Sequence, residues 1–203
     1  MTELRTREDI QAYYPEPHPL AKNKELCRLD RHCRQFISLA PFVVISTSDA
    51  SGRCDATPRG DAPGFVAVAD DRTLLIPDRS GNNRVDTMLN IAENPHVGLL
   101  FLVPGMAETL RVNGRATITI DPEILGLLIA GGQMPRAAIR VEIEEIYFQC
   151  GKALMRSELW NAGKHVPRET FAPFGQIFSE HSKTQYDPAI EAILDEEYRT
   201  NLY

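Results

Sequence analysis

Between Pro41 and Cys150 the sequence is a series of short β-rich segments separated by turns, with few helical segments between them. Such a chain must form a sheet whose sequential strands are joined mainly by tight connections. About six strands of this kind favour a mainly β (α+β) fold, a small barrel with helices at its ends. The expected strands fall within residues 41–49, 54–59, 64–70, 73–78, 96–103, 109–120 and 137–150.

The order of elements argues against two common nucleotide-binding folds. Strands and helices do not alternate regularly, as they do in a doubly wound parallel sheet. The sequence also contains neither G-x-G-x-x-G nor G-x-x-x-x-G-K-[ST], which weakens both an NAD-binding and a P-loop interpretation.

Three helices are expected within the strand-rich region or just before it, at residues 23–39, 82–93 and about 122–129. The first is predicted from apolar residues at helical spacing, and Pro41 ends it. Residues 1–22 contain YYPEPHP and are predicted to form an N-terminal arm, because prolines interrupt both helices and strands. Residues from about 163 to 203 are predicted to form a helical extension, so that 1–203 is a single domain with two appendages.

Composition excludes several functional classes. The 22 basic and 28 acidic residues give a net charge of −6, which argues against a general nucleic-acid binder or a membrane-surface protein. No apolar run has the roughly 18 residues of a membrane-spanning helix, and the charged N-terminus resembles no signal peptide. The four cysteines form no C-x-x-C pair, so neither a metal site nor a disulfide scaffold is expected. We expect a cytoplasmic protein.

The segment IPDRSGNNRVDTMLNIAENP, residues 76–95, has features that suit a phosphate monoester. Gly81 permits the left-handed backbone that lets neighbouring N–H groups converge, and the expected helix start near Asn82 presents further unpaired N–H groups. Arg79 and Arg84 can supply charge-assisted contacts, with polar contacts from Ser80, Asn82 and Asn83. The alternative is an ordinary helix start, capped by Ser80 or Asn82, with solvated arginines.

A second loop, ATPRGDAPGF at residues 56–65, connects two expected strands. Arg59, Gly60 and Asp61 lie at the junction, where an arginine can reach a ligand and a glycine allows close backbone approach. The alternative is a hairpin turn with a solvated ion pair.

The segment ETLRVNGRA, residues 108–116, is expected to be a strand with Thr109, Arg111 and Asn113 on one face. Such a polar face usually meets solvent, but it can also line a groove at a subunit boundary. We expect Glu142, Glu144 and Glu145 to form a solvated edge.

No catalytic triad or carboxylate pair is recognisable, and the nucleophile motif G-x-S-x-G is absent. If the protein is a catalyst, its reactive group is expected to come from a cofactor.

Five blocks in this order resemble the pyridoxamine 5′-phosphate oxidase-like, FMN-binding split-barrel superfamily, over about residues 35–162. They are SLAPFVVIST, TPRGD, IPDRSGNNRVDTMLNIAENPHVGLLFLVPG, ETLRVNGRA and FQCGKALMRSELW. The resemblance implies a six-stranded split β-barrel with flanking helices that forms a homodimer. It also implies FMN in a groove shared between the two chains, with a small-molecule substrate that stays unknown.

The resemblance assigns roles to individual residues. Where the superfamily has Ser-Arg-Lys before the helix, this chain has Asn82-Asn83-Arg84, so Arg84 would replace the phosphate-binding lysine and Asn82 the serine. Pro77 and Asp78 would lie against the isoalloxazine edge. The full expected cofactor-binding set is Arg59, Gly60, Asp61, Pro77, Asp78, Arg79, Gly81, Asn82, Asn83, Arg84, Thr109, Arg111 and Trp160.

Some of these contacts are expected from the second chain. The candidates are Thr109 and Arg111, followed by Lys152, Ser157 and Trp160; for Trp160, packing of the C-terminal segment is an equal alternative. The acidic C-terminus, SKTQYDPAIEAILDEEYRTNLY, lacks the arginine- and histidine-bearing segment of true pyridoxamine phosphate oxidases. The chain therefore resembles the uncharacterised FMN-binding relatives more than the true oxidases.

Two functions remain open at this point. The first is an FMN-dependent oxidoreductase, and the second is a non-catalytic protein that binds or stores a flavin or another phosphorylated ligand. In a further variant the barrel binds F420 or haem, although a polyanionic tail would need more basic residues along the groove than this acidic chain offers.

Overall fold

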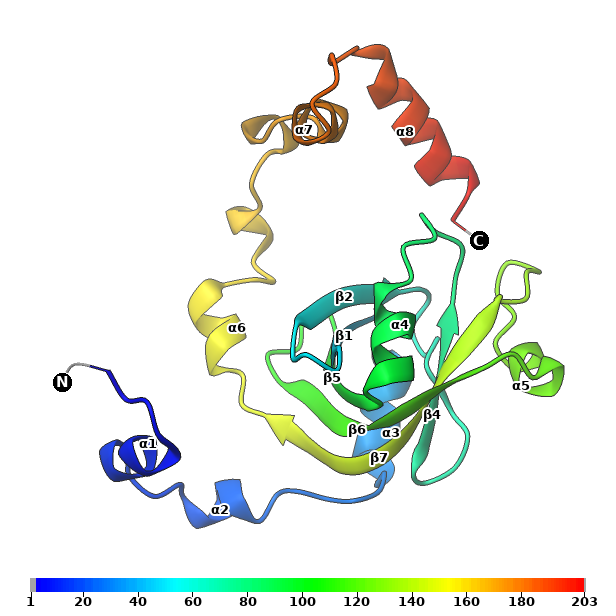
Figure 1. Ribbon diagram of the computed structural model, residues 1–203. Coiled ribbons are helices and arrows are strands. Elements are labelled where there is room, and N and C mark those ends of the chain that lie inside the picture. Colours follow the sequence, from blue (N-terminus) through cyan, green and yellow to red (C-terminus); the bar gives the residue numbers. More distant parts are fainter. Residues whose placement is uncertain (1–2, 203) are drawn as a thin grey trace.

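The computed structural model describes residues 3–202 and contains one antiparallel sheet of seven strands, in the order β2-β1-β5-β6-β7-β4-β3 (Figure 1). The expected mainly β architecture is confirmed. The shortest strand, β3, has only two residues. The strands are β1 Phe42–Ser48, β2 Cys54–Gly60, β3 Ala67–Val68, β4 Thr73–Asp78, β5 His96–Leu102, β6 Thr109–Thr119 and β7 Ala137–Gln149.

Within residues 3–202, eight α-helices and two short 3-10 helices flank the sheet or extend from it. Helix α4 packs on β1, β2 and β6, and α5 packs on β7. The helices are α1 Arg7–Tyr13, α2 Pro19–Lys22, α3 Arg31–Leu39, α4 Asp86–Glu93, α5 Pro122–Gly126, α6 Lys152–Ser157, α7 Phe174–His181 and α8 Ala189–Thr200, with η1 Ala162–Lys164 and η2 Arg168–Thr170.

Alternation along the strands produces the main core. Every second residue of β1 and β5 points inward, as the burial of Val43, Ile45, Leu99 and Phe101 shows. Strand β4 differs because it is buried on both faces. Leu74 and Ile76 belong to the main core, whereas Leu75 packs with Leu125 and Leu128 near α5.

A β-bulge changes the alternation of β7. Asn113 pairs with Glu145 and Gly114 pairs with Ile143, so Glu144 is the extra residue of the bulge. The expected solvent exposure is found for Glu142 and Glu144, but Glu142 does not lie at a sheet edge, because it pairs with Arg115 of β6 and with Thr73 of β4. The Glu145 carboxylate accepts a hydrogen bond from Asn113 Nδ2.

Helix α3 is shorter than the sequence pattern predicts. It begins at Arg31 because the Asp30 carboxylate accepts a hydrogen bond from the backbone N of Cys33 at 2.8 Å and caps the helix. The preceding residues are not helical, and Leu26 forms an isolated antiparallel bridge with Ile146 of β7. Leu29, Cys33 and Ile37 nevertheless reach the main core.

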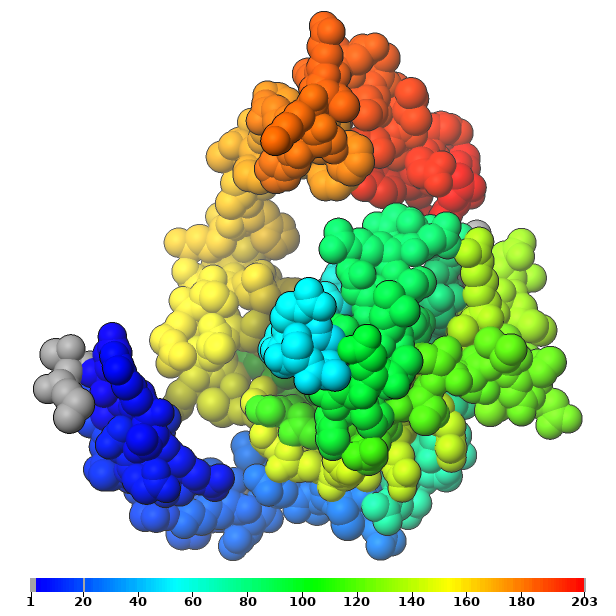
Figure 2. All heavy atoms as spheres, viewed as in Figure 1, coloured from blue at the N-terminus to red at the C-terminus, as the bar shows by residue number. Residues whose placement is uncertain are grey.

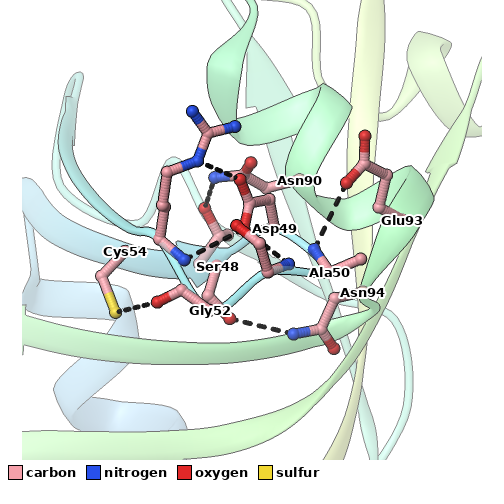
Figure 3. Close-up of polar contacts among 11 residues, drawn as sticks. Ser48, Asp49, Ala50, Gly52, Cys54, Asn90, Glu93 and Asn94 are labelled. Atoms are coloured by element: carbon pink, nitrogen blue, oxygen red, sulfur yellow. Dashed lines mark hydrogen bonds and ion pairs between the residues drawn. The ribbon is translucent and has the colours of Figure 1, made fainter.

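Polar side chains attach α4 to the strands beneath it (Figure 3). Asn90 Nδ2 donates to Thr47 Oγ1 at 3.0 Å, and Asn94 Nδ2 donates to Ser48 Oγ at 2.9 Å. The Glu93 carboxylate accepts from the backbone N of Ala50 in the β1–β2 turn at 3.3 Å. These contacts hold α4, and the loop before it, at a defined place on the barrel.

The β1–β2 turn is organised by one carboxylate. Asp49 Oδ1 accepts from Ser51 Oγ at 2.7 Å and from the backbone N of Ser51 and Arg53, and Asp49 Oδ2 accepts from Arg53 Nε at 2.6 Å. These hydrogen bonds, the one from the Ser51 hydroxyl above all, hold the pKa of Asp49 well below the ordinary range of a carboxyl group.

Because the pKa of Asp49 is lower in the folded than in the unfolded protein, its charge stabilises the fold above a pH of about 4. That contribution is lost as the pH falls from there through the folded-state pKa. Asp49→Asn keeps the shape of the side chain and removes the charge, so we expect a lower unfolding midpoint at pH 7. The difference from the wild type should shrink between pH 5 and pH 3.

Thermal unfolding followed by circular dichroism across this pH range measures the effect. Glu144→Gln, at an exposed carboxylate of the bulge, is the control and should give a small, pH-independent change. A gap between Asp49→Asn and the wild type that stays constant down to pH 3 contradicts the assignment.

Both ends of the chain extend away from the barrel. Figure 1 shows α1 and α2 on one side, and α6 to α8 forming an arch that returns toward the barrel at the C-terminus. Figure 2 shows an open space between this arch and the barrel. Large apolar side chains of these segments are exposed, among them Tyr13, Tyr14, Phe171, Phe174 and Phe178. Within residues 3–202, no helix combines the length and apolar character that crossing a membrane requires.

Candidate functional site

A cleft of about 510 Å3 lies between the end of β2 and the end of β4. These strands are not neighbours in the sheet, so the cleft occupies the place where two distant parts of the curled sheet approach each other. Its lining is Pro58, Arg59, Gly60, Asp61, Phe65, Pro77, Asp78, Arg79, Ser80, Gly81, Asn82, Asn83, Arg84, Val85, Arg136 and Leu202. Its volume is within the range of about 300–1,000 Å3 that is typical of small-molecule sites.

The structure brings together most of the residues that the sequence analysis singled out. Ten of them line this cleft: Arg59, Gly60, Asp61, Pro77, Asp78, Arg79, Gly81, Asn82, Asn83 and Arg84. The other three, Thr109, Arg111 and Trp160, are not part of its lining.

An ion pair joins the two sides of the cleft. Arg79 Nε donates to Asp61 Oδ2 at 2.7 Å, and the two side chains are only 16% and 2% exposed. Arg79 Nη1 also donates to the backbone O of Leu128, just after α5, at 2.7 Å. Arg79 therefore links the β2–β3 loop, the end of β4 and the α5 region, and its guanidinium is largely committed to these protein partners.

In the loop after β4, the residue with a left-handed backbone is not the one that the sequence predicted. Gly81 is not among the glycines with a left-handed backbone, whereas Asn83 has a φ of 57°. Asn82 Oδ1 accepts from the backbone N of Arg84 at 3.0 Å. The predicted left-handed position was therefore wrong by two residues, and an asparagine, which tolerates this conformation better than most residues, adopts it.

Helix α4 begins at Asp86, four residues later than predicted. Its N-cap is Val85, which makes no side-chain capping hydrogen bond. The alternative in which Ser80 or Asn82 caps the helix is therefore wrong. The first turn of α4 begins next to the cleft, because Val85 is part of the lining.

Arg84 lies on the open side of the cleft. Its side chain is 77% exposed, and Nε donates to Asp86 Oδ2 at 2.6 Å. The hydrogen bond and the negative charge of Asp86 raise the pKa of Arg84 above its ordinary value. An arginine in an exposed ion pair of this kind can turn toward an anion in the cleft at little cost.

Arg59 has a buried donor that the protein does not satisfy. Its Nη1 makes long hydrogen bonds of 3.3 Å to Thr57 Oγ1 and to the backbone O of Pro58. Its Nε is buried and donates to no acceptor in the described part of the chain. An unsatisfied buried donor costs about 1–3 kcal/mol, so this atom indicates a position that an acceptor from outside the chain can fill.

Arg136 was not identified by the sequence analysis. Its Nη1 donates to Asn83 Oδ1 at 2.7 Å. The pairing of β4 with β7 explains its position, because Asp78 is opposite Ala137 and the next residues outward are Arg79 and Arg136. A correct strand register would have placed Arg136 at the cleft, but no local motif indicates it.

The remaining predicted residues make contacts within the chain. Thr109 Oγ1 donates to Gln149 Oε1 at 3.3 Å, and Arg111 Nε donates to Asn113 Oδ1 at 3.2 Å. Trp160 Nε1 donates to the backbone O of Met106 at 2.7 Å, which attaches the segment after α6 to the β5–β6 turn. The weaker candidates Lys152 and Ser157 belong to α6.

Charge at the cleft is opposite in sign to that of the whole chain. The lining has four arginines and two aspartates, Asp61 and Asp78, whereas the chain has a net charge of −6. Such a local excess of guanidinium groups favours an anionic ligand. No cluster of three or more side chains suited to a metal ion occurs among residues 3–202.

Comparison with known proteins places the chain among related folds. The family model described as pyridoxamine 5′-phosphate oxidase matches residues 29–150. No curated protein sequence matches the chain significantly.

Among solved structures, a HupZ variant from Group A Streptococcus is similar, with a TM-score of 0.50 and 18% identity over 59% of this chain and 98% of that chain. A Lactobacillus delbrueckii protein proposed to be a pyridoxamine 5′-phosphate oxidase has 22% identity over 61% of this chain and 98% of that one, with a TM-score of 0.48. General Stress Protein 26 from Bacillus anthracis has 16% identity, coverages of 58% and 93%, and a TM-score of 0.43. At these identities the likeness concerns the fold alone.

Proposed function

The chain belongs to the pyridoxamine 5′-phosphate oxidase family, and from this premise we propose that it is an FMN-binding flavoprotein that acts as an oxidoreductase. The buried, unsatisfied Nε of Arg59 in an arginine-rich cleft is the observation that carries the proposal. It calls for an acceptor atom from a ligand at this place, and the surrounding positive charge favours an anionic one.

The cleft residues fit the two chemically different ends of FMN. Arg84, the polar loop of residues 80–83 and the nearby start of α4 supply donors suited to a phosphate group. Phe65 and Pro77 supply apolar surface beside Arg59, which suits a planar ring with acceptor atoms at its edge. The lining of the cleft therefore offers one region suited to a phosphate group and another suited to a planar ring.

FMN would supply hydride transfer at its ring, and this chain would supply binding, orientation and charge. The Arg59 N–H groups would stabilise negative charge on a ring oxygen or nitrogen placed against them. Arg79 would act indirectly, because its bonds to Asp61 and to the Leu128 carbonyl hold both walls of the cleft in place.

A homodimer would complete the site. The cleft is open, and Thr109, Arg111 and Trp160 lie outside its lining, so they would contribute to the corresponding cleft of a second copy. The exposed aromatic side chains of the terminal segments would be covered by the same association.

We place this dimer in the cytoplasm, on the grounds of the acidic composition and the sparse, unpaired cysteines.

The first test is the visible absorption spectrum of the purified protein, followed by release of the ligand on heating. We expect flavin bands, with close to one FMN per chain. Addition of NADH or NADPH, followed by air, then separates the two functions. Reduction and reoxidation over many cycles support an oxidoreductase, whereas a flavin that stays oxidised supports the binding or storage alternative. A colourless protein that takes up no added FMN rules out the flavin oxidoreductase and the storage of a flavin alike.

Arg59 offers a specific prediction. Arg59→Ala and Arg59→Lys both remove Nε, and we expect each to weaken binding of FMN and of riboflavin alike by about tenfold or more, as loss of a buried charged donor bond implies. Titration of flavin fluorescence measures both affinities. Arg140→Ala, at an exposed arginine of β7 outside this cleft, is the matched control. Unchanged affinities in both Arg59 variants contradict the assignment.

A further inference from the structure

Arg136 occupies a distinctive place in the cleft. It lies between the buried Pro135 and the first residue of β7, so its backbone position is set by the sheet. It lines the main cleft and also a smaller pocket of about 170 Å3 formed by Asp78, Arg79, Ser80, Gln133, Met134, Pro135 and Arg136. Its guanidinium therefore lies beside the loop of residues 80–84, where Nη1 contacts Asn83 Oδ1.

Two of the four cleft arginines, Arg59 and Arg136, form no ion pair within residues 3–202, whereas the other two do. Arg79 is paired with Asp61 and Arg84 with Asp86. Arg136 hydrogen-bonds only the neutral amide oxygen of Asn83, as far as residues 3–202 are concerned. Asp78 lines both pockets with Arg136 but forms no ion pair with it, so the positive charge of Arg136 is available to an anion from outside the chain.

The partner of Arg136 has the only left-handed non-glycine backbone of this loop, within the described residues. A φ of 57° at Asn83 is uncommon and persists where the surroundings hold it. The 2.7 Å bond from Arg136 supplies such a restraint and fixes the direction of both side chains. The hydrogen bond from Arg84 N to Asn82 Oδ1 restrains the neighbouring residues in the same way.

We propose that Arg136 is the second guanidinium of an anion site at this loop. It would bind the phosphate group of a phosphate monoester together with Arg84, while Asn83 acts as a positioning residue. Arg79 does not fill this role, because Asp61 and the Leu128 carbonyl engage it. The inference rests on the proposed function for the identity of the ligand. It adds that selection for a phosphorylated flavin depends on a residue from the α5–β7 loop.

The test compares FMN with riboflavin, which differ only by the phosphate. The ratio of their dissociation constants isolates the phosphate contact from the ring contacts. For Arg136→Ala we expect FMN affinity to fall about 10- to 100-fold, since a charge-assisted hydrogen bond is lost, with less than about a threefold change for riboflavin. Arg136→Lys should give an intermediate loss, because the charge remains but the planar fork does not.

Two variants at Asn83 test the positioning role. Asn83→Gly keeps the backbone conformation accessible and removes the amide, so FMN affinity should fall only severalfold. Asn83→Asp places a carboxylate against Arg136 and should lower FMN affinity more than Asn83→Gly, because the carboxylate competes with the phosphate. Riboflavin affinity should stay within about threefold in both. Inorganic phosphate should compete with FMN for the wild type and only weakly for Arg136→Ala.

The outcomes separate this inference from the function on which it rests. Arg140→Ala is the matched control and should leave both affinities unchanged. If the wild type prefers FMN and Arg136→Ala, Arg136→Lys and Asn83→Asp keep the same preference, the inference is overturned while the flavin proposal stands. Equal affinity of the wild type for FMN and riboflavin overturns the inference as well. If the wild type binds neither flavin, both proposals fail.

Discussion

Asp61→Ala is expected to destabilise the protein by about 3–5 kcal/mol, the usual cost of leaving a buried charge without its partner. The Asp61 side chain is 2% exposed, and its Oδ2 accepts from Arg79 Nε at 2.7 Å across the cleft. Removing the carboxylate leaves the guanidinium of Arg79, whose side chain is only 16% exposed, next to an apolar methyl group. Because this pair joins the β2 end to the β4 end, the same substitution should loosen the cleft walls.

Urea unfolding of four variants measures the effect. Asp61→Ala and Arg79→Met are the single changes, and their combination should cost at least about 1 kcal/mol less than their sum, because the double variant has no unpaired buried charge. The matched control is Asp86→Ala, which breaks the exposed pair with Arg84 and should cost about 1 kcal/mol at most. A loss below about 1 kcal/mol for Asp61→Ala would mean that the pair contributes as little as a surface pair.

Gly114→Ala is expected to cost about 3 kcal/mol, at the upper end of the range for overpacking a buried site. A Cβ at this position would lie 2.1 Å from the backbone O of Glu142. The obstacle is main chain in the middle of the longest strand pair, next to the bulge at Glu144, so it cannot turn aside as a flexible side chain would. Relief requires a shift of β6 against β7.

Thermal and urea unfolding of Gly114→Ala provide the measurement, and we also expect reduced soluble yield. Gly126→Ala is the control, because a Cβ there meets no atom within 4 Å and the residue lies at the end of α5. That variant should be neutral or slightly stabilised, as alanine favours a helix more than glycine does. Equal midpoints for the two variants would contradict the importance of the close approach at Gly114.

Strands such as β1 and β5 were predictable because each buries one face, and alternation appears directly in the sequence. Residues 73–78 form a strand without alternation because α5 covers their second face, and only the length of the apolar run indicated it. The predicted secondary structure was wrong where a contact between residues distant in the sequence competes with the local conformational preference. Residues 23–30 have helical spacing, yet they form no helix, and Leu26 pairs with Ile146 of β7 instead. The consecutive residues Glu144 and Glu145 mark the bulge, but their pattern is also that of a solvated face.

The part of the candidate site that is formed by residues close together in the sequence was predictable. Residues 58–61 and 77–84 are the ends of β2 and β4 with the loop residues that follow them, they contain recognisable arginines and glycines, and both segments line the cleft. The commitment of Arg79 to Asp61 was not predictable, since the two residues are brought together only by the curvature of the sheet. Arg136 was missed for a similar reason, because its position depends on the register between β4 and β7.

The place of the cleft in the sheet order has a mechanical consequence. Around most of its circumference the barrel is held by ladders of backbone hydrogen bonds, but at the cleft β2 and β4 are joined by side chains instead. A ligand bound in the cleft would contact both strand ends and hold them together. Binding of the ligand and closure of the barrel would therefore favour each other. At a hundredfold excess over its dissociation constant, such a ligand adds about 2.7 kcal/mol to the stability of the closed form. Because the cleft lies where the barrel lacks backbone pairing, a bound molecule would itself stabilise the barrel that binds it.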